Sequence, residues 1–188
     1  MQISPSPYRA ARWKLRHRQG VPMRAELTSG QVDMTQTTDN GNTVELRLTF
    51  LSAKANVRAA LASVMSGIGA MKLCDDDKST VELVLAEVLN NVAEHAYREE
   101  GGGIIELHLR QAGQGLICRV LDNGAAMPSS TLPAGYPPNP NRPRELQPEG
   151  GFGWFLIRKL TSDLAYFRRQ DRNILSFQIA VGQAVLSN

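Results

Sequence analysis

Apolar residues recur along this chain with two different periods, one typical of strands and one typical of helices. The order of these segments limits the folds that the chain can adopt. Apolar and polar residues alternate from Val44 to Phe50 and again from Ile105 to Leu109, as they do in half-buried strands. Apolar residues recur at helical spacing over residues 53–70 and 79–97. The remaining apolar segments predict strands near residues 116–121, 164–168 and 174–181 and a helix over residues 154–160.

This order of segments favours an α+β fold. Strands joined by short turns pair antiparallel, and the helices between them must bury their apolar stripes on the sheet. We expect a two-layer α/β sandwich, in which helices cover one face of a mixed, mostly antiparallel sheet. The second helix is expected to begin at a capping box formed by Ser79 and Glu82, after a polar connector over residues 74–78.

The basic charge of the chain is concentrated near its start. Of 21 Lys and Arg residues, six lie in residues 1–24, which hold no acid, so 15 basic residues face 18 acidic ones in the remainder. We therefore expect a basic, disordered extension over residues 1–42 and one folded domain over residues 43–188. A basic arm can contact nucleic acid or anionic lipid. The mildly acidic body argues against nucleic-acid binding as the main function.

The sequence predicts neither a membrane span nor secretion. No apolar run approaches the roughly 20 residues that cross a bilayer, and no apolar segment with a cleavage site follows the first charges. Cys74 and Cys118 have no spacing typical of a metal site or a disulfide, so both are interpreted as structural thiols. We expect a cytoplasmic protein.

Three polar residues of the second expected helix are spaced four apart: Glu87, Asn91 and His95. At about 100° per residue they drift only about 80° around the helix axis, so they share one face away from the apolar stripe. Carboxylate and carboxamide oxygens can ligate Mg²⁺, and a carboxylate can take a proton from an attacking hydroxyl. A solvated polar face is the simpler interpretation of this spacing when it is considered alone.

Two glycine turns follow, separated by a proline-rich segment. Asp122-Asn123-Gly124 ends a buried strand, where a carboxylate stands beside a glycine that lets backbone approach a flat ligand. Gly150-Gly151-Phe152-Gly153 precedes the third expected helix, where unpaired N–H groups suit a phosphate. Residues 125–149 carry too many prolines for a helix or strand, and so long a loop is often functional. Ordinary turns would explain each glycine motif by itself.

Taken in order, these motifs resemble the N, G1 and G2 boxes of the GHKL, or Bergerat-fold, ATPases. The most specific part is the string Glu87-x-x-x-Asn91-x-x-x-His95-Ala96-Tyr97, and the resemblance covers about residues 43–181. Within that superfamily the chain is most similar to the anti-sigma-factor serine/threonine kinases of bacterial partner-switching systems.

The resemblance implies a site for ATP and Mg²⁺. Asn91 matches the asparagine that coordinates Mg²⁺ between the phosphates, and Glu87 matches the acid that activates the attacking hydroxyl. His95 belongs to the same nucleotide-binding motif. Asp122 matches the aspartate that hydrogen-bonds the adenine amino group, with Gly124 making room beside the base.

The phosphates are expected at the second glycine turn, which comprises Gly151, Phe152 and Gly153. The resemblance implies that residues 125–149 form the ATP lid. Three departures from the family pattern concern this lid, and one of them is its unusually high proline content. Ala126 stands where a second glycine is expected, and Glu149 stands where some family kinases carry a basic residue. A cation for the γ-phosphate must then come from elsewhere, and the candidates are Arg142 and Arg144 in the lid.

The function implied is Mg²⁺-dependent transfer of the ATP γ-phosphoryl group to a serine or threonine of an anti-anti-sigma (STAS-type) partner. That partner would compete with a sigma factor for the kinase, which is expected to form a homodimer. Two alternatives stay open: a non-catalytic module gated by ATP, and the ATPase domain of a histidine-kinase-like phosphorelay. The second has less support, because His17 lies in the basic arm and no dimerising helical pair precedes the domain.

Overall fold

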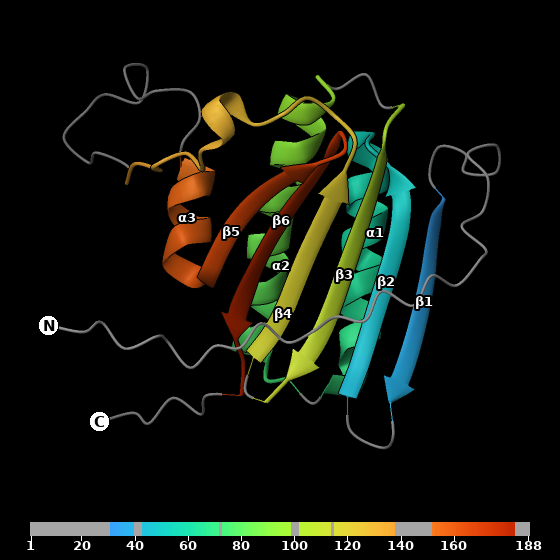
Figure 1. The fold of residues 1–188 in the computed structure, drawn as a ribbon. Helices are drawn as coiled ribbons and strands as arrows, with labels where there is room; N and C mark the ends of the chain where they lie inside the picture. The colour runs from blue at the N-terminus through green and yellow to red at the C-terminus, as the bar shows by residue number, and fades with distance from the viewer. Residues whose placement is uncertain are drawn as a thin grey trace, which may run out of the picture.

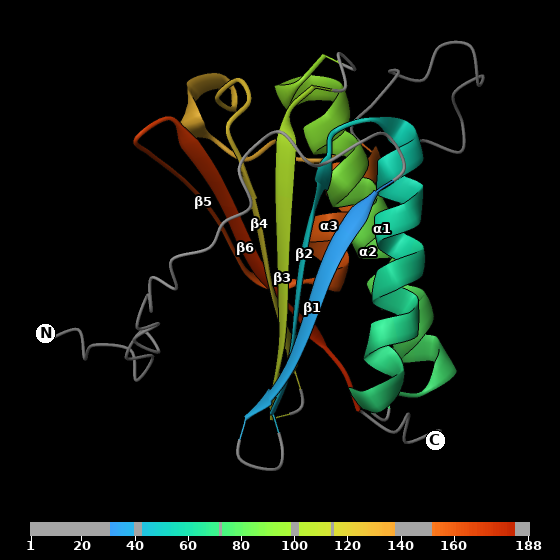
Figure 2. The same ribbon diagram turned by 90° about the vertical axis from the view of Figure 1, so that its right-hand side faces the viewer.

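The chain forms two layers, a six-stranded sheet and three helices on one of its faces (Figures 1 and 2). The computed structural model describes residues 31–39, 43–71, 73–98, 102–113, 115–137 and 152–182. The strands are β1 (Val32–Asp39), β2 (Thr43–Leu51), β3 (Ile104–Ala112), β4 (Gly115–Asp122), β5 (Ser162–Arg169) and β6 (Arg172–Ala180). The helices are α1 (Lys54–Gly67), α2 (Asp75–Asn91) and α3 (Phe152–Leu160), with 3-10 turns η1 (Ile68–Met71) and η3 (Pro128–Ser130) and the π-helical turn η2 (Val92–Ala96).

The strands follow the order β1-β2-β3-β4-β6-β5. Every pair among them is antiparallel, so the expected mixed sheet is corrected to a wholly antiparallel one within the described residues. The α+β sandwich with helices on one face is confirmed. β4 lies between β3 and β6, and its last residue, Asp122, faces Asn173 of β6 in register. This register brings a residue late in the chain to the end of β4.

The core lies between the sheet and the helices. Burial alternates along β2, β3 and β4 with the two-residue period of a strand. Leu48 and Leu107 on the sheet and Leu85 and Leu89 on α2 are fully buried. Cys118 faces the same core, and burial raises the pKa of its thiol. In the part of the chain described here, no helix is long and apolar enough to span a membrane.

The sheet begins earlier than the sequence predicted. β1 lies inside the expected disordered extension, yet it pairs with β2 from Val32↔Phe50 to Asp39↔Thr43. An edge strand has one neighbour and buries little, so its sequence does not need the apolar alternation that revealed the other strands. The folded domain therefore includes residues 32–39, and residues 1–30 lie outside the described part of the chain.

α2 begins at Asp75, so the predicted capping box at Ser79 is wrong. Cys74 caps the helix, and its Sγ accepts a hydrogen bond from the Asp77 amide at 3.4 Å. Ser79 lies one turn inside the helix and donates to the Asp75 carbonyl at 2.9 Å. The first turn consists of aspartates, which the positive end of the helix dipole favours. Because these residues are all polar, hydrophobic periodicity could not reveal them as helical.

Candidate functional site

The carboxyl ends of α2 and β4 and the amino end of α3 lie at the same, upper end of the molecule in Figure 1. These are the places where the sequence predicted the three motifs.

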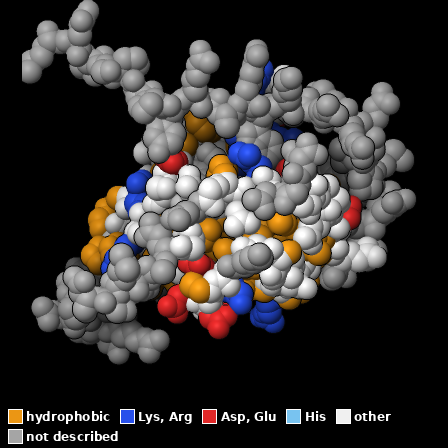
Figure 3. Space-filling view, turned by 90° about the horizontal axis from the view of Figure 1, so that it is seen from below, with side chains coloured by type: hydrophobic (Ala, Val, Ile, Leu, Met, Phe, Trp, Pro, Cys, Tyr) orange, Lys and Arg blue, Asp and Glu red, His pale blue; other side chains and the backbone are white. Residues whose placement is uncertain are grey.

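Seen from below, acidic, basic and apolar side chains are interspersed over the described surface rather than gathered in one patch (Figure 3).

α2 changes from α-helical to π-helical pairing directly after Asn91. The Tyr97 amide donates to the Val92 carbonyl, five residues earlier, at 3.3 Å. At the end of this turn, where helical carbonyls lack partners within the helix, the Ala96 carbonyl accepts a hydrogen bond from the Ala125 amide at 2.8 Å among the described residues. π-helical turns are frequent at functional sites. Here the turn joins the end of α2 to the first residue after the Asp122–Gly124 motif.

Gly124 packs directly against that turn. A Cβ atom at this position would lie 2.6 Å from the Ala96 carbonyl oxygen, which is backbone and cannot rotate away. The close approach therefore requires glycine at position 124. Gly124 is thus needed for packing against this turn, in addition to leaving the room for a base that the resemblance implied.

The first turn of α3 lies across α2 at the predicted catalytic face. A Cβ atom on Gly153 would overlap Oε2 of Glu87 and would lie 3.7 Å from Nδ2 of Asn91. The missing side chain of Gly153 thus leaves a space bordered by a carboxylate and an amide. The structure brings these three predicted residues together, although they are far apart in the sequence.

Nδ2 of the Asn91 amide is buried, and it has no hydrogen-bond partner among the described residues. Such an orphan costs about 1–3 kcal/mol, and in native proteins it points to a missing ligand or water. Rotated by 180° about its last bond, the same carboxamide would present Oδ1 to a cation. The described residues contain no group of three or more His, Cys, Asp or Glu that could hold a metal. Mg²⁺ fits this set if phosphates supply most of its ligands, as is usual in nucleotide sites.

The structure leaves five other predicted site residues either exposed or outside the described part of the chain. His95 lies in the π-helical turn and is exposed. Phe152 is 47% exposed, and its ring stacks on that of Phe155 with centroids 6.0 Å apart. Gly151, Arg142 and Arg144 lie outside the described residues.

The described start of the expected lid, residues 125–137, packs back on α3. Arg158 of α3 donates to the Pro133 carbonyl at 2.7 Å and to the Leu132 carbonyl at 3.1 Å. Gly135, with φ +71°, approaches the backbone of α3 so closely that a Cβ atom would lie 2.5 Å from the Phe155 nitrogen. Ala126 does not have a positive φ, so the alanine that replaces the expected glycine causes no backbone strain.

Asp122 is buried, with 5% of its surface exposed. Its Oδ1 accepts hydrogen bonds from the Gly124 amide at 2.8 Å and from Nδ2 of Asn173 at 2.7 Å. Burial raises the pKa of this carboxyl above its usual value, while the hydrogen bonds from Asn173 and Gly124 and the charges of nearby arginines act in the opposite direction. Both hydrogen bonds that the Asp122 carboxylate accepts from described residues end on Oδ1, which leaves Oδ2 available for a ligand.

Sequence reasoning missed Asn173, Tyr166 and Arg168, which surround Asp122 from β5 and β6. Tyr166 and Arg168 donate to Oδ1 of Asn173 at 2.7 and 2.6 Å. The sequence did contain a signal for Asn173. This residue lies two positions before Leu175, so the two-residue alternation of buried residues along β6 includes it. A polar residue at such an inward position requires a hydrogen-bond partner.

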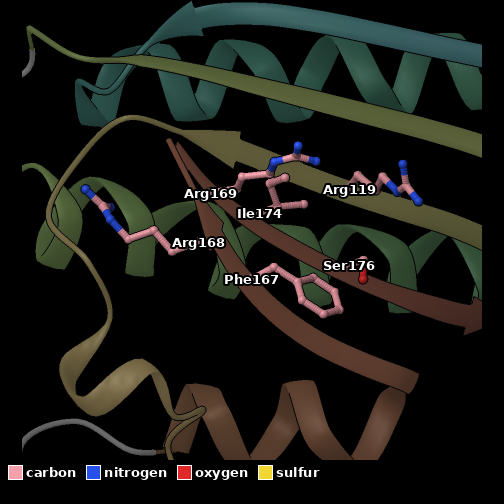
Figure 4. Close-up of a pocket in the computed structure, with 6 residues that line it drawn as sticks. All are labelled: Arg119, Phe167, Arg168, Arg169, Ile174 and Ser176. Atoms are coloured by element: carbon pink, nitrogen blue, oxygen red, sulfur yellow. The ribbon is translucent and has the colours of Figure 1, made fainter. Parts of the chain in front are cut away.

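A hollow of about 440 Å³ lies over β4, β5 and β6. Figure 4 shows the residues that line it. It is lined by Arg119, Phe167, Arg168, Arg169, Ile174 and Ser176. None of the predicted nucleotide-binding residues takes part in it.

Residues 50–179 match the family described as histidine kinase-like ATPase domains. The chain belongs to this family. The histidine kinase-like ATPase domain described here is 31% identical over 127 residues to the serine-protein kinase RsbW of Bacillus mycoides (strain KBAB4), an alignment that covers 66% of this chain and 79% of that protein. It is 30% identical, with the same coverage, to the RsbW of Bacillus cereus (strain G9842).

Its fold is similar to a crystal structure of the RsbU and RsbW domains of a protein from Mycobacterium tuberculosis. The TM-score is 0.50 at 14% identity, over 73% of this chain and 32% of that one, so the domain spans about a third of the solved chain. The relationship to the GHKL ATPases expected from the motifs is confirmed, and the relatives are serine-protein kinases named RsbW.

Proposed function

We propose that this domain is an Mg-ATP-dependent serine/threonine kinase whose substrate is an anti-anti-sigma protein of the STAS type. Relatives named serine-protein kinases support phosphoryl transfer to a hydroxyl. The observation that carries the proposal is the space where a Cβ atom on Gly153 would stand, which Glu87 and Asn91 border. It joins a carboxylate, a buried amide nitrogen with no partner among the described residues, and the start of a helix at one point.

Each of these groups has a task in this proposal. Glu87 orients the acceptor hydroxyl and takes its proton, while the backbone at Gly151 and Gly153 holds phosphate oxygens. Oδ2 of Asp122 accepts a hydrogen bond from the adenine amino group. Bound through Asn91 and the phosphates, Mg²⁺ would neutralise phosphate charge during transfer. The protein contributes mainly by holding the reacting groups in place.

Further parts of the proposal rest on the resemblance to partner-switching kinases. Arg142 or Arg144 of the lid would supply the cation for the γ-phosphate. A sigma factor and the unphosphorylated STAS partner would compete for the same domain, which would act as a homodimer in the cytoplasm.

Incubation of the purified domain with γ-labelled ATP and an anti-anti-sigma (STAS-type) protein from the same organism tests this proposal. We expect acid-stable label on one serine or threonine of that partner. ATP binding without transfer would instead indicate a nucleotide-gated binding module. Acid-labile label on a histidine would indicate a phosphorelay.

The Gly153→Ala variant is expected to fold but to transfer phosphate slowly. The added Cβ would displace the end of the Glu87 side chain, which is flexible, so the fold need not change. Because a misplacement of about 1 Å can cost roughly a hundredfold in rate, we expect transfer to fall by about tenfold to a hundredfold. The measurement is the single-turnover rate at saturating ATP.

Gly69→Ala is the matched control for this variant. A Cβ atom at Gly69 meets nothing within 4 Å, so transfer should stay at the wild-type rate. If Gly153→Ala transferred phosphate as fast as Gly69→Ala, the space beside Glu87 would have no part in catalysis.

A further inference from the structure

Asn173 is a buried amide at the start of β6, directly opposite Asp122, with 4% of its surface exposed. Its Nδ2 donates to Oδ1 of Asp122 at 2.7 Å and to the Ala125 carbonyl at 3.0 Å. One side-chain amide thus contacts both the carboxylate and the first residue of the expected lid.

The other end of the amide is fixed as well. Oδ1 of Asn173 accepts hydrogen bonds from the Tyr166 hydroxyl at 2.7 Å and from Nη1 of Arg168 at 2.6 Å. These two donors set the orientation of the amide, because a flipped amide would turn its oxygen toward the Asp122 carboxylate. Asn173 therefore always presents a donor to Asp122.

The same side chains hold the backbone that follows β4. The Tyr166 hydroxyl accepts a hydrogen bond from the Met127 amide at 3.1 Å, and Nη1 of Arg168 donates to the Gly124 carbonyl at 3.1 Å. Together with the bond from Asn173 to Ala125, these contacts fix residues 124–127 relative to β5 and β6.

We propose that Asn173 is a positioning residue that makes the site select adenine over guanine. The inference rests on the proposed function, in which Asp122 contacts the base. Adenine carries an amino group, a donor, at the ring position where guanine carries a carbonyl, an acceptor. An ionised carboxylate can only accept, so it binds the first and repels the second. By donating to Oδ1, Asn173 holds the carboxylate with Oδ2 free for the base.

The electrostatics of Asp122 support this selection. Burial favours the protonated carboxyl and raises its pKa, whereas the hydrogen bond from Asn173 lowers it and so favours the ionised acceptor. Arg168 and Arg172 act in the same direction as Asn173. Without the Asn173 donor, the carboxyl would be protonated more readily, and a protonated carboxyl can donate to the guanine carbonyl.

The test compares ATP and GTP dissociation constants for the wild-type domain and the Asn173→Leu variant by calorimetry. We expect ATP affinity to fall by about tenfold or more, because the Asp122 carboxylate loses the hydrogen bond from Asn173. GTP affinity should fall less. The preference for ATP over GTP should therefore narrow. Equal weakening of both nucleotides would indicate a purely structural role and overturn the inference. Ser176→Ala, on the other face of β6, is the control and should keep the wild-type preference.

Tyr166→Phe provides a second variant if Asn173→Leu does not fold. It removes one of the two donors to Oδ1 of Asn173, so the preference for ATP should narrow in the same direction but by less. An unchanged preference in Tyr166→Phe would contradict the inference. Wild-type protein that bound neither nucleotide would contradict the proposed function, whereas ATP binding with unaltered selectivity in folded variants would contradict only the role of Asn173.

Discussion

The Asn91→Ala variant is expected to lose Mg-ATP binding while gaining stability. Loss of the metal-binding carboxamide should weaken Mg-ATP binding by at least about a hundredfold. Nδ2 of Asn91 is buried without a partner among the described residues, so its removal breaks no hydrogen bond with any of them. An unsatisfied buried amide costs about 1–3 kcal/mol, so the nucleotide-free variant should unfold at a higher temperature than the wild type. Calorimetric titration with Mg-ATP and thermal unfolding without nucleotide measure the two effects.

Asn90→Ala is the matched control, because Asn90 is the neighbouring residue of α2 and its side chain is exposed. It should bind Mg-ATP like the wild type. If Asn91→Ala also bound Mg-ATP with wild-type affinity, Asn91 would not be the metal residue. A marked loss of stability in Asn91→Ala would show that the amide has a structural partner.

The Glu87→Gln variant is expected to bind ATP normally and to transfer phosphate slowly. Glutamine has the shape of glutamate, so its contact with Gly153 should persist, and the half-buried site should keep its geometry. A neutral amide cannot take a proton from the acceptor hydroxyl, which should lower the transfer rate by about a hundredfold to ten-thousandfold. Parallel measurements of ATP affinity and of label transfer to the STAS partner separate binding from chemistry.

Glu94→Gln controls for a general loss of negative charge at this end of α2. Glu94 is exposed and lies 3.8 Å from Lys54 in a surface ion pair, which contributes little. The Glu94→Gln variant should transfer phosphate at the wild-type rate. A normal transfer rate in Glu87→Gln would mean that another group acts as the base.

The strong periodicities of the sequence predicted most of the fold. β2, β3, β4, β6 and the three helices bury one face each, so their apolar residues recur with a fixed period. β1 and the first turn of α2 escaped prediction because neither depends on burial. The backbone of β2 holds β1, and the thiol of Cys74 caps α2 beside the aspartates of its first turn.

The candidate site was predicted less completely. Short motifs identified Glu87, Asn91 and Gly153, and the structure brings them around one small space; their chemical roles stay predictions. Asn173 escaped because its importance comes from the strand register that puts it opposite Asp122, and pairing between β4 and β6 cannot be read from local sequence. The π-helical turn was missed for a similar reason, since helical periodicity assumes regular α-helical pairing.

The double attachment of Ala125 bears on how a nucleotide would leave the site. Its amide is bonded to the Ala96 carbonyl and its own carbonyl to Asn173, so we expect any swinging of the loop to hinge further along the chain. Ser129 and Ser130, with φ of 53° and 51°, are the first strained positions beyond it. Opening there would leave the base contacts assembled. ADP would then be retained by the same adenine contacts as ATP. The rate at which ATP replaces ADP would be set by the contacts to the phosphates.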